Sequence, residues 1–341
     1  MSALALAIHA FEGLPAPDFA RRAAVDLLVR SAREKLTRAD PLVEVRFADE
    51  MSRYPVATHT DAANTQHYEL PPAFFEQVLG ARLKYSCCLY GPGVTDLDGA
   101  EEAALAATAA HAEIADGQMI LELGCGWGSL GLWLAEQFPS SRVVSVSNSR
   151  TQKQFIEARA AARGLRNIAV LTADMNDFDI EVRFDRIVSV EMFEHMANWA
   201  ELLRRARGWL KDDGRMFVHV FSHLVTPYRF DADDPADWIG RHFFSGGIMP
   251  SHGLMRRFSD DFAVEADWRW SGEHYARTAR AWLSRFDANA AAIRPILEDV
   301  YGPNAELWRR RWRLFFLATE GLFGHAGGQE WGVSHYRLRP L

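Results

Sequence analysis

Two carboxylates and an imidazole stand within five residues of one another, at Glu191, Glu194 and His195. They follow the apolar run 186–190, which predicts a strand, and open α/β sheets bind their ligands at the carboxyl ends of such strands. Carboxylates at that edge could attract a cation, and a carboxylate or a neutral imidazole could accept a proton from it. The residues alone leave one simpler alternative open, a polar pair on the surface at the start of a helix.

A second group of residues has the spacing of a nucleotide-binding turn. The segment 122–128 reads Glu-x-Gly-x-Gly-x-Gly, with glycines at Gly124, Gly126 and Gly128. A strand that turns sharply into a helix needs glycine where the backbone approaches a ligand or adopts a positive φ. The dinucleotide motif Gly-x-Gly-x-x-Gly places its third glycine one residue later. The spacing therefore favours another nucleoside ligand, and a glycine-rich turn without a ligand is the alternative.

Polar residues also follow the next two apolar runs. Ser147 and Asn148 end the second run, with Gln152 one turn into the next predicted helix, and Asp174-Met175 follows the third. Neutral donors and acceptors at the first position could bind ribose hydroxyls in place of a carboxylate. An aspartate after the third run could accept a hydrogen bond from the same nucleoside. Capping of the helix by Ser147 or Asn148, and a solvent-facing Asp174, are the alternatives.

The elements that must position these residues alternate between strand and helix from residue 117 to about 222. This alternation predicts an α/β fold, a mostly parallel sheet with helices on both faces. The predicted strands are 119–123, 142–147, 168–172, 186–190 and 215–221, and the predicted helices are 129–138, 151–163 and 198–210.

The rest of the chain divides by texture. Residues 1–116 predict a helical N-terminal extension and lid, with helices over 18–36 and 73–79. The core would occupy 117–224. In 225–328 the alternation fails and the composition becomes aromatic, which predicts an inserted cap, and 329–341 predicts a strand returning to the edge of the sheet.

Composition sets the broad class. The chain has 341 residues, of which 48% are hydrophobic and 24% charged, as in an ordinary globular protein. The formal net charge of −7 argues against nucleic acid as a partner. Three cysteines, two of them adjacent, do not make a disulfide framework. With neither a basic leader segment nor an apolar run long enough to span a bilayer, we expect a cytoplasmic protein.

Several motifs together are similar to those of one enzyme superfamily. Residues 85–88, 122–128, 147–152 and 193–195 resemble the cyclopropane-fatty-acid synthase superfamily of class I, Rossmann-like methyltransferases. Within it, the chain is more similar to the coclaurine-type (benzylisoquinoline) N-methyltransferases. The closer match lies in 66–71, 83–88, 189–196, 237–251, 274–278 and 328–331, with His335.

The resemblance implies a class I fold, S-adenosylmethionine as methyl donor, no metal, and a cap over the acceptor. It assigns nine residues to the donor site. They are Tyr85, Ser86, Gly124, Gly126, Ser147, Asn148, Gln152, Asp174 and Met175.

The acceptor separates the subfamilies. The lipid-modifying synthases hold bicarbonate with Cys, Glu, His and Tyr, and all four motif positions are occupied here, at Cys87, Glu194, His219 and Tyr275. The amine methylators retain the same residue types, so this set does not decide. At position 191, however, the synthases have Gly and the amine methylators have Glu, as this chain does.

A basic amine gives these carboxylates a task. An aliphatic amine with a pKa near 10 is only about 0.1% neutral at pH 7, so it needs both attraction and a base. Glu191, or Glu69 of the motif 67–69, could attract the ammonium, and Glu194 with His195 could accept its proton. An alkene acceptor forms a carbocation whose proton bicarbonate removes, so it does not need the extra carboxylate.

The aromatic region 225–328 predicts mainly core, since aromatic side chains bury large areas whatever the function. A few rings could form a box for a flat cationic amine, and we expect Phe244 and Trp331 to contact the substrate. The run 308–313, Trp-Arg-Arg-Arg-Trp-Arg, could lie on an anionic membrane. Exposure of its arginines to solvent or to a second subunit of a homodimer is the favoured interpretation.

The sequence thus predicts an S-adenosylmethionine-dependent N-methyltransferase acting on a small aromatic or heterocyclic amine. One alternative is a cyclopropane-fatty-acyl-phospholipid synthase or lipid C-methyltransferase that uses bicarbonate as its base. A weaker alternative is a catalytically silent protein that binds S-adenosylmethionine.

Overall fold

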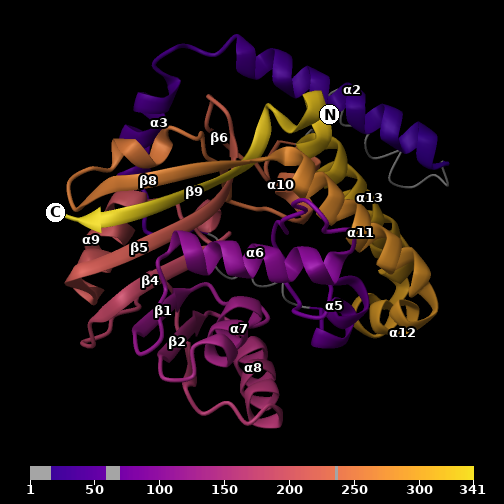
Figure 1. Ribbon diagram of the computed structural model, residues 1–341. Coiled ribbons are helices and arrows are strands. Elements are labelled where there is room, and N and C mark those ends of the chain that lie inside the picture. The colour runs from indigo at the N-terminus through magenta and orange to yellow at the C-terminus, as the bar shows by residue number, and fades with distance from the viewer. Residues whose placement is uncertain (1–16, 59–69, 235–236) are drawn as a thin grey trace.

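The centre of the molecule is one seven-stranded sheet with helices on both faces (Figure 1). The computed structural model describes residues 17–58, 70–234 and 237–341. The strand order is β3-β2-β1-β4-β5-β9-β8. The strands are β1 Met119–Leu123, β2 Arg142–Ser147, β3 Ile168–Thr172, β4 Phe184–Val190, β5 Leu210–His223, β8 Phe262–Ser271 and β9 Trp331–Pro340.

Five of these strands, β1 to β5, are parallel to one another. Their apolar sequences suit burial on both faces, which a parallel sheet covered by helices provides. From β1 the chain adds β2 and β3 on one side, and then β4 and β5 on the other. The order reverses between β1 and β4, and open α/β sheets place their ligands at such a switch point. The predicted fold class is confirmed.

The helices form the layers around this sheet, and Figure 1 shows α11, α12 and α13 gathered at one end of the molecule. The helices are α2 Asp18–Thr37, α3 Val43–Met51, α5 Pro72–Val78, α6 Leu97–His111, α7 Ser129–Gln137, α8 Arg150–Ala162, α9 Trp199–Trp209, α10 Trp238–His242, α11 Gly272–Ala288, α12 Ala290–Tyr301 and α13 Ala305–Gly324. Short 3-10 turns cover Phe193–His195, Leu254–Arg257, Gly302–Asn304 and His325–Gly328, and β6 Tyr228–Arg229 pairs with β7 Ile248–Met249.

The last strand lies elsewhere than the sequence predicts. β9 returns antiparallel to β5, but β8, from within the range assigned to the cap, pairs with its other side. The predicted edge position of 329–341 is therefore wrong. The sequence did not indicate β8, because it is an edge strand in which only Phe262 and Trp270 are buried, so it lacks the apolar run of the parallel strands.

The N-terminal helix α2 lies along α13, as Figure 1 shows. Arg313 of α13 donates to Asp18 of α2 at 2.7 Å and to Asp287 of α11 at 2.8 Å. A guanidinium can bind two carboxylates through its planar set of donors. This arginine of the run 308–313 therefore ties helices together within the chain.

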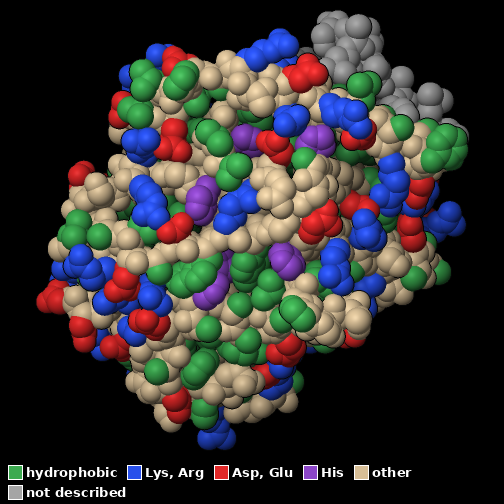
Figure 2. Space-filling model, turned by 45° about the horizontal axis from the view of Figure 1, so that its top comes forward, with side chains coloured by type: hydrophobic (Ala, Val, Ile, Leu, Met, Phe, Trp, Pro, Cys, Tyr) green, Lys and Arg blue, Asp and Glu red, His purple; other side chains and the backbone are tan. Residues whose placement is uncertain are grey.

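The surface charges and the described helices show whether the protein has features for binding nucleic acid or crossing a membrane. On the described part of the face in Figure 2, basic and acidic side chains are interspersed, so this face has no uniformly basic surface of the kind that binds nucleic acid. Among the described residues, no helix combines the length and apolar character needed to cross a membrane. All three cysteines are buried thiols.

Candidate active site

A pocket opens at the carboxyl ends of β1, β2 and β4 and is closed on one side by the loop 83–86. All nine residues assigned to the donor site line it, and so do Glu191 and His195. Their segments are spread over more than 100 residues of the chain, from Tyr85 to His195. The sheet brings them together because parallel strands present their carboxyl ends at a common edge.

The glycine turn after β1 forms one wall of this pocket. The N–H groups of Gly124 and Cys125 both donate to the carbonyl of Val146 at 3.0 Å, which ties the turn to β2. Gly124 has φ +80° and Gly126 has φ +50°, values that favour glycine. A Cβ on Gly126 would meet no atom within 4 Å, so a ligand can approach the backbone closely there.

Glu122, which opens the motif, is buried beneath this turn. Its carboxylate accepts a hydrogen bond of 2.6 Å from the hydroxyl of Ser145 on β2. Burial raises the pKa of Glu122 to about 7. The side chain therefore lines the pocket as a carboxyl poised to ionise when a cationic group approaches.

The pocket wall contains buried polar atoms that lack a hydrogen-bond partner within the described residues. Four of them, on residues that line the pocket, are Gln152 Nε2, Trp127 Nε1, Ser129 Oγ and Thr108 Oγ1. Buried polar groups are nearly always paired, by protein, water or ligand. A ligand rich in hydroxyl, amino and carboxylate groups fits this wall, as S-adenosylmethionine would.

The polar residues after β2 do more than cap a helix. Ser149 is the N-cap of α8, its hydroxyl accepting from the N–H of Gln152 at 3.3 Å. Ser147 donates to the side-chain oxygen of Gln152 at 2.6 Å, and the amide nitrogen of Gln152 has no partner among the residues that the structure describes. The alternative of capping by Ser147 or Asn148 is therefore wrong. After β3, Asp174 lines the pocket and accepts from the N–H of Asn176 at 2.8 Å.

The loop 80–86 is held by two buried charged residues whose roles the sequence did not indicate. Glu101 of α6 accepts from the backbone N–H groups of Gly80, Arg82 and Lys84 at 2.9, 2.7 and 3.1 Å. Lys84, only 2% exposed, donates to the Ser86 hydroxyl at 2.5 Å and to a backbone carbonyl at 2.7 Å. Glu101 lies four residues after Leu97, on the apolar face of α6, and that position was the available signal.

Removing the Glu101 carboxylate should destabilise this loop. Glu101→Ala leaves two buried N–H groups and one part-buried N–H group without this acceptor, at about 1–3 kcal/mol for each buried group. We expect the free energy of unfolding to fall by about 3 kcal/mol or more in urea denaturation, together with weaker binding of S-adenosylhomocysteine. The control is Glu157→Ala, whose side chain is 51% exposed and pairs with Lys153 at 3.7 Å. Equal stability of the two variants would contradict this role.

Glu191 adopts a backbone conformation that is unusual for its residue type. Its φ of +48° lies in the left-handed region, which costs a residue with a Cβ about 1–2 kcal/mol. Three groups hold its carboxylate: the N–H of Cys87 at 2.9 Å, Nε2 of His219 at 3.2 Å, and the hydroxyl of Tyr275 at 2.7 Å. Such strain persists where the surroundings over-determine it, and it clusters at functional sites.

The two carboxylates of the motif occupy different surroundings. The Glu191 side chain is 9% exposed and borders the pocket, and burial raises its pKa. Glu194 is fully buried behind it, and one oxygen accepts from the N–H of Phe221 at 2.6 Å. Burial, and then the negative charge of Glu191, raise the pKa of Glu194 well above its usual value. The pair therefore resists carrying two negative charges at once.

His195 lies at the rim of the pocket, with its ring 4.5 Å from that of Phe244. Burial lowers the pKa of His195 to about 4, so its imidazole is neutral at neutral pH. Phe244 also lies 5.5 Å from Phe221 and 5.0 Å from Phe230. These rings form an aromatic wall beside the imidazole.

The remaining predicted substrate residues have different positions. Cys87, His219 and Tyr275 lie outside the pocket lining but converge on Glu191. Trp331 is fully buried, and its indole donates to the Tyr228 hydroxyl at 3.3 Å. Glu69 lies outside the described residues. Among those described, no group of three or more His, Cys, Asp or Glu side chains could hold a metal ion.

Comparison with known proteins gives the family. The family model described as mycolic acid cyclopropane synthetase matches residues 57–326. The chain is 38% identical over 296 residues to the (S)-coclaurine N-methyltransferase of Thalictrum flavum subsp. glaucum, covering 85% of this chain and 82% of that protein. It is 30% identical over 270 residues to the cyclopropane-fatty-acyl-phospholipid synthase of Escherichia coli (strain K12), covering 79% and 66%.

Solved structures agree with these sequence relationships. A crystal structure of coclaurine N-methyltransferase bound to N-methylheliamine and S-adenosylhomocysteine matches with a TM-score of 0.89 and 33% identity, covering 98% of this chain and 97% of that one. The cyclopropane synthase MmaA2 of Mycobacterium tuberculosis matches with a TM-score of 0.69 and 22% identity, covering 83% and 98%, and so shares the fold. The chain belongs to the mycolic acid cyclopropane synthetase family of S-adenosylmethionine-dependent methyltransferases.

Proposed function

We propose that the chain transfers a methyl group from S-adenosylmethionine to the nitrogen of a small aromatic or heterocyclic amine. The observation that carries this proposal is the position of Glu191. Its carboxylate borders the donor pocket, next to the aromatic wall, in a strained conformation that three hydrogen bonds maintain. A buried carboxylate at that place is suited to a cationic acceptor.

The residues of the pocket would hold the donor as follows. The backbone of the glycine turn would lie against it, Ser147, Asn148 and Gln152 would meet the ribose, and Asp174 with Met175 would meet the adenine. Bound S-adenosylmethionine supplies an electrophilic methyl carbon. The loop 83–86 covers the same pocket, so that Tyr85 and Ser86 would exclude water from the reacting groups.

Glu191 would attract the ammonium form of the amine and fix its position. The amine must then lose a proton before its lone pair can attack in line with the bond that breaks. His195 is neutral, borders the pocket and lies beside the ring of Phe244, so it is placed to accept this proton. Glu194 is buried behind the pocket, and one of its oxygens has no hydrogen-bond partner among the described residues. We propose that it assists His195 in accepting the proton.

The lipid-modifying alternative has less support from this geometry. The motif resemblance assigns bicarbonate to Cys87, Glu194, His219 and Tyr275. Three of these residues instead contact the Glu191 carboxylate, which lies where an anion would have to bind. A neutral alkene offers no charge to pair with Glu191. The names and sequence identities of the relatives, (S)-coclaurine N-methyltransferase foremost, support the amine.

A screen of acceptors tests this proposal. Purified protein is incubated with S-adenosylmethionine and a library of amines, and release of S-adenosylhomocysteine is measured. We expect turnover with primary or secondary amines that carry an aromatic ring, unchanged by removal of bicarbonate. Vesicles of unsaturated phospholipid should give none. Bicarbonate-dependent methylation of the vesicles, without activity on any amine, would overturn the proposal.

We also propose, from the sequence, a cytoplasmic location and a homodimer. Ultracentrifugation of the purified protein would test the homodimer. The division into a lid over 1–116, a core over 117–224 and a cap over 225–328 likewise stays a proposal. Limited proteolysis would test it by its cleavage sites.

A further inference from the structure

A chain of three imidazoles leads away from Glu191. Nε2 of His219 lies 3.2 Å from the Glu191 carboxylate, and Nδ1 of His219 lies 2.9 Å from Nε2 of His335. The other nitrogen of His335, Nδ1, lies 2.9 Å from Nδ1 of His111. The rings come from β5, β9 and the last residue of α6. Neither His111 nor His335 has a role in the proposed methyl transfer.

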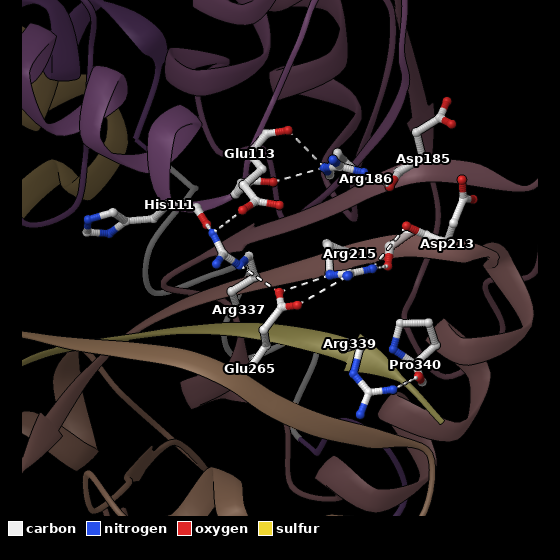
Figure 3. A network of polar contacts seen from close by, with 12 residues as sticks. His111, Glu113, Asp185, Arg186, Asp213, Arg215, Glu265, Arg337, Arg339 and Pro340 are labelled. Atoms are coloured by element: carbon white, nitrogen blue, oxygen red, sulfur yellow. Dashed lines mark hydrogen bonds and ion pairs between the residues drawn. The ribbon is translucent and has the colours of Figure 1, made fainter.

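The chain runs from the protein interior to the surface. His219 and His335 are fully buried, whereas His111 is partly exposed. Aromatic rings contact the outer two imidazoles. The ring centroid of Trp270 lies 4.2 Å from that of His335, and Trp268 is stacked on His111 with their centroids 3.9 Å apart. Arg337 pairs with Glu265 at 2.8 Å and donates to the backbone carbonyl of His111 at 3.3 Å. Figure 3 shows the ring of His111 directed away from both of these residues.

The charged groups around the chain favour neutral rings. Burial is the main cause that lowers the pKa of each of the three imidazoles. The positive charge of Lys84 lowers the pKa values of His219 and His335 further, and that of Arg337 lowers the pKa of His111. Glu191 is the acidic group in contact with the inner end.

Neutral rings restrict where the protons can lie. Each ring carries one N–H, and each nitrogen–nitrogen contact needs one hydrogen. Only two arrangements satisfy both nitrogen–nitrogen contacts. Either every N–H points inward, toward Glu191, or every N–H points outward, in the direction from Glu191 to His111. The first arrangement suits an ionised Glu191, because Nε2–H of His219 then donates to the carboxylate. The second suits a protonated Glu191, whose O–H then donates to Nε2 of His219.

We propose that Glu191 exchanges a proton with solvent through His219, His335 and His111, losing it when a cationic amine enters the site and regaining it when the product leaves. This inference rests on the proposed function, because it assumes a cationic acceptor at Glu191. The exchange gives Glu191 a negative charge only while a cation is present to balance it. An empty site thus avoids the cost of a buried, unpaired carboxylate.

The proton balance closes in each direction. On binding, the Glu191 O–H bond breaks and an N–H bond forms at Nε2 of His219. Nδ1–H of His219 passes to Nε2 of His335, Nδ1–H of His335 passes to Nδ1 of His111, and Nε2–H of His111 passes to water. Four bonds break and four form, every ring stays neutral, and one proton reaches solvent. Product release reverses each transfer, so no ring needs to rotate.

A quaternary cation tests this exchange without turnover. N,N-dimethyltetrahydroisoquinolinium has no N–H, so any proton released when it binds must come from the protein. Protein saturated with S-adenosylhomocysteine is mixed with it in weak buffer, and a pH indicator is followed by stopped flow. We expect rapid release of up to one proton per site. Isochroman, the uncharged oxygen analogue of the parent ring, should release none.

Variants of the outer ring identify the path. We expect His111→Gln, which can form hydrogen bonds but cannot pass a proton through, to slow proton release by at least about tenfold. His111→Ala should be slowed likewise and be rescued by imidazole, but not by pyrazole, whose two nitrogens are adjacent and so cannot accept a proton on one side of the ring and release one on the other. The control is His252→Gln. His252 contacts Ser334 and Asp267 and is not one of the three linked imidazoles.

Two results would overturn the exchange and leave the proposed function intact. One is wild-type protein that binds the cation without releasing a proton. The other is equally fast release in wild type, His111→Gln and His335→Gln, each shown by thermal melting to be folded. A protein that neither binds the cation nor methylates any amine would instead refute the proposed function, and the exchange with it.

Discussion

Replacing Glu191 by Gln should lower kcat/KM for the amine by about 100- to 1000-fold, the largest effect expected of any single side chain. Removing one partner of a buried charge pair costs about 3–4 kcal/mol. The amide keeps the shape of the side chain but loses the charge that attracts the ammonium. Binding of S-adenosylhomocysteine, measured by calorimetry, should stay within about twofold, because Glu191 only borders the donor pocket.

The pH dependence gives a second measurement of the same variant. Burial raises the pKa of Glu191 above the usual 4.5 of a glutamate. The carboxyl is neutral below this raised pKa and ionised above it, so kcat/KM should fall as the pH falls through it. In Glu191→Gln this acidic limb should disappear, whereas loss of the neutral amine at low pH affects both proteins alike.

A milder variant provides the control for charge. Tyr275→Phe removes the hydrogen bond of 2.7 Å that the Tyr275 hydroxyl donates to the Glu191 carboxylate, but keeps the charge of Glu191. We expect a reduction of about tenfold or less, in keeping with the loss of one hydrogen bond to a charged group. If Glu191→Gln retained the kcat/KM of wild type, Glu191 would have no part in binding or reacting with the amine.

Gly124→Ala should abolish most of the donor affinity. Gly124 has φ +80°, and a Cβ there would lie 2.6 Å from Cγ of Met192. Met192 lines the pocket between Glu191 and the 3-10 turn, so its displacement disturbs both donor and acceptor sides. We expect the Kd for S-adenosylhomocysteine to rise by about 100-fold or more, which corresponds to about 3 kcal/mol.

Gly164→Ala is the matched control for this glycine. Gly164 also has a positive φ, +70°, but a Cβ there would meet nothing within 4 Å, and the residue does not line the pocket. Both variants carry the left-handed backbone cost of about 1 kcal/mol, so both should melt at a lower temperature. Only Gly124→Ala should lose donor affinity. Equal affinities in the two variants would show that the turn after β1 does not bind the donor.

The parallel part of the sheet was predictable because its strands carry short apolar runs, as strands covered by helices do. Apolar runs bounded by turn residues indicated β1, β2 and β3 at the residues where the structure has them, and shorter cores of β4 and β5. The edge strand β8 gave a weaker signal, because only Phe262 and Trp270 of its residues are buried. The pattern therefore indicated β9, which is buried along most of its length, but not β8.

The grouping of the proposed donor-site residues around one pocket was predictable for a related reason. Its residues stand in short motifs directly after strands, and parallel strands place such turns at one edge. The acceptor side was less accessible, because its contacts join distant segments. Glu191 meets Cys87 and Tyr275 across 104 and 84 residues, and Lys84 and Glu101 hold the loop through backbone groups that no motif marks.

By itself, the amino-acid sequence determined the family, the α/β class, the glycine turn and the set of polar residues at the strand ends, because each is encoded in local spacing and residue type. Only the tertiary structure decided which of these side chains touch. It placed Glu191 among three hydrogen-bonding partners and linked it through His219 and His335 to His111, since these contacts depend on the pairing of β5 with β9 and on the docking of α6.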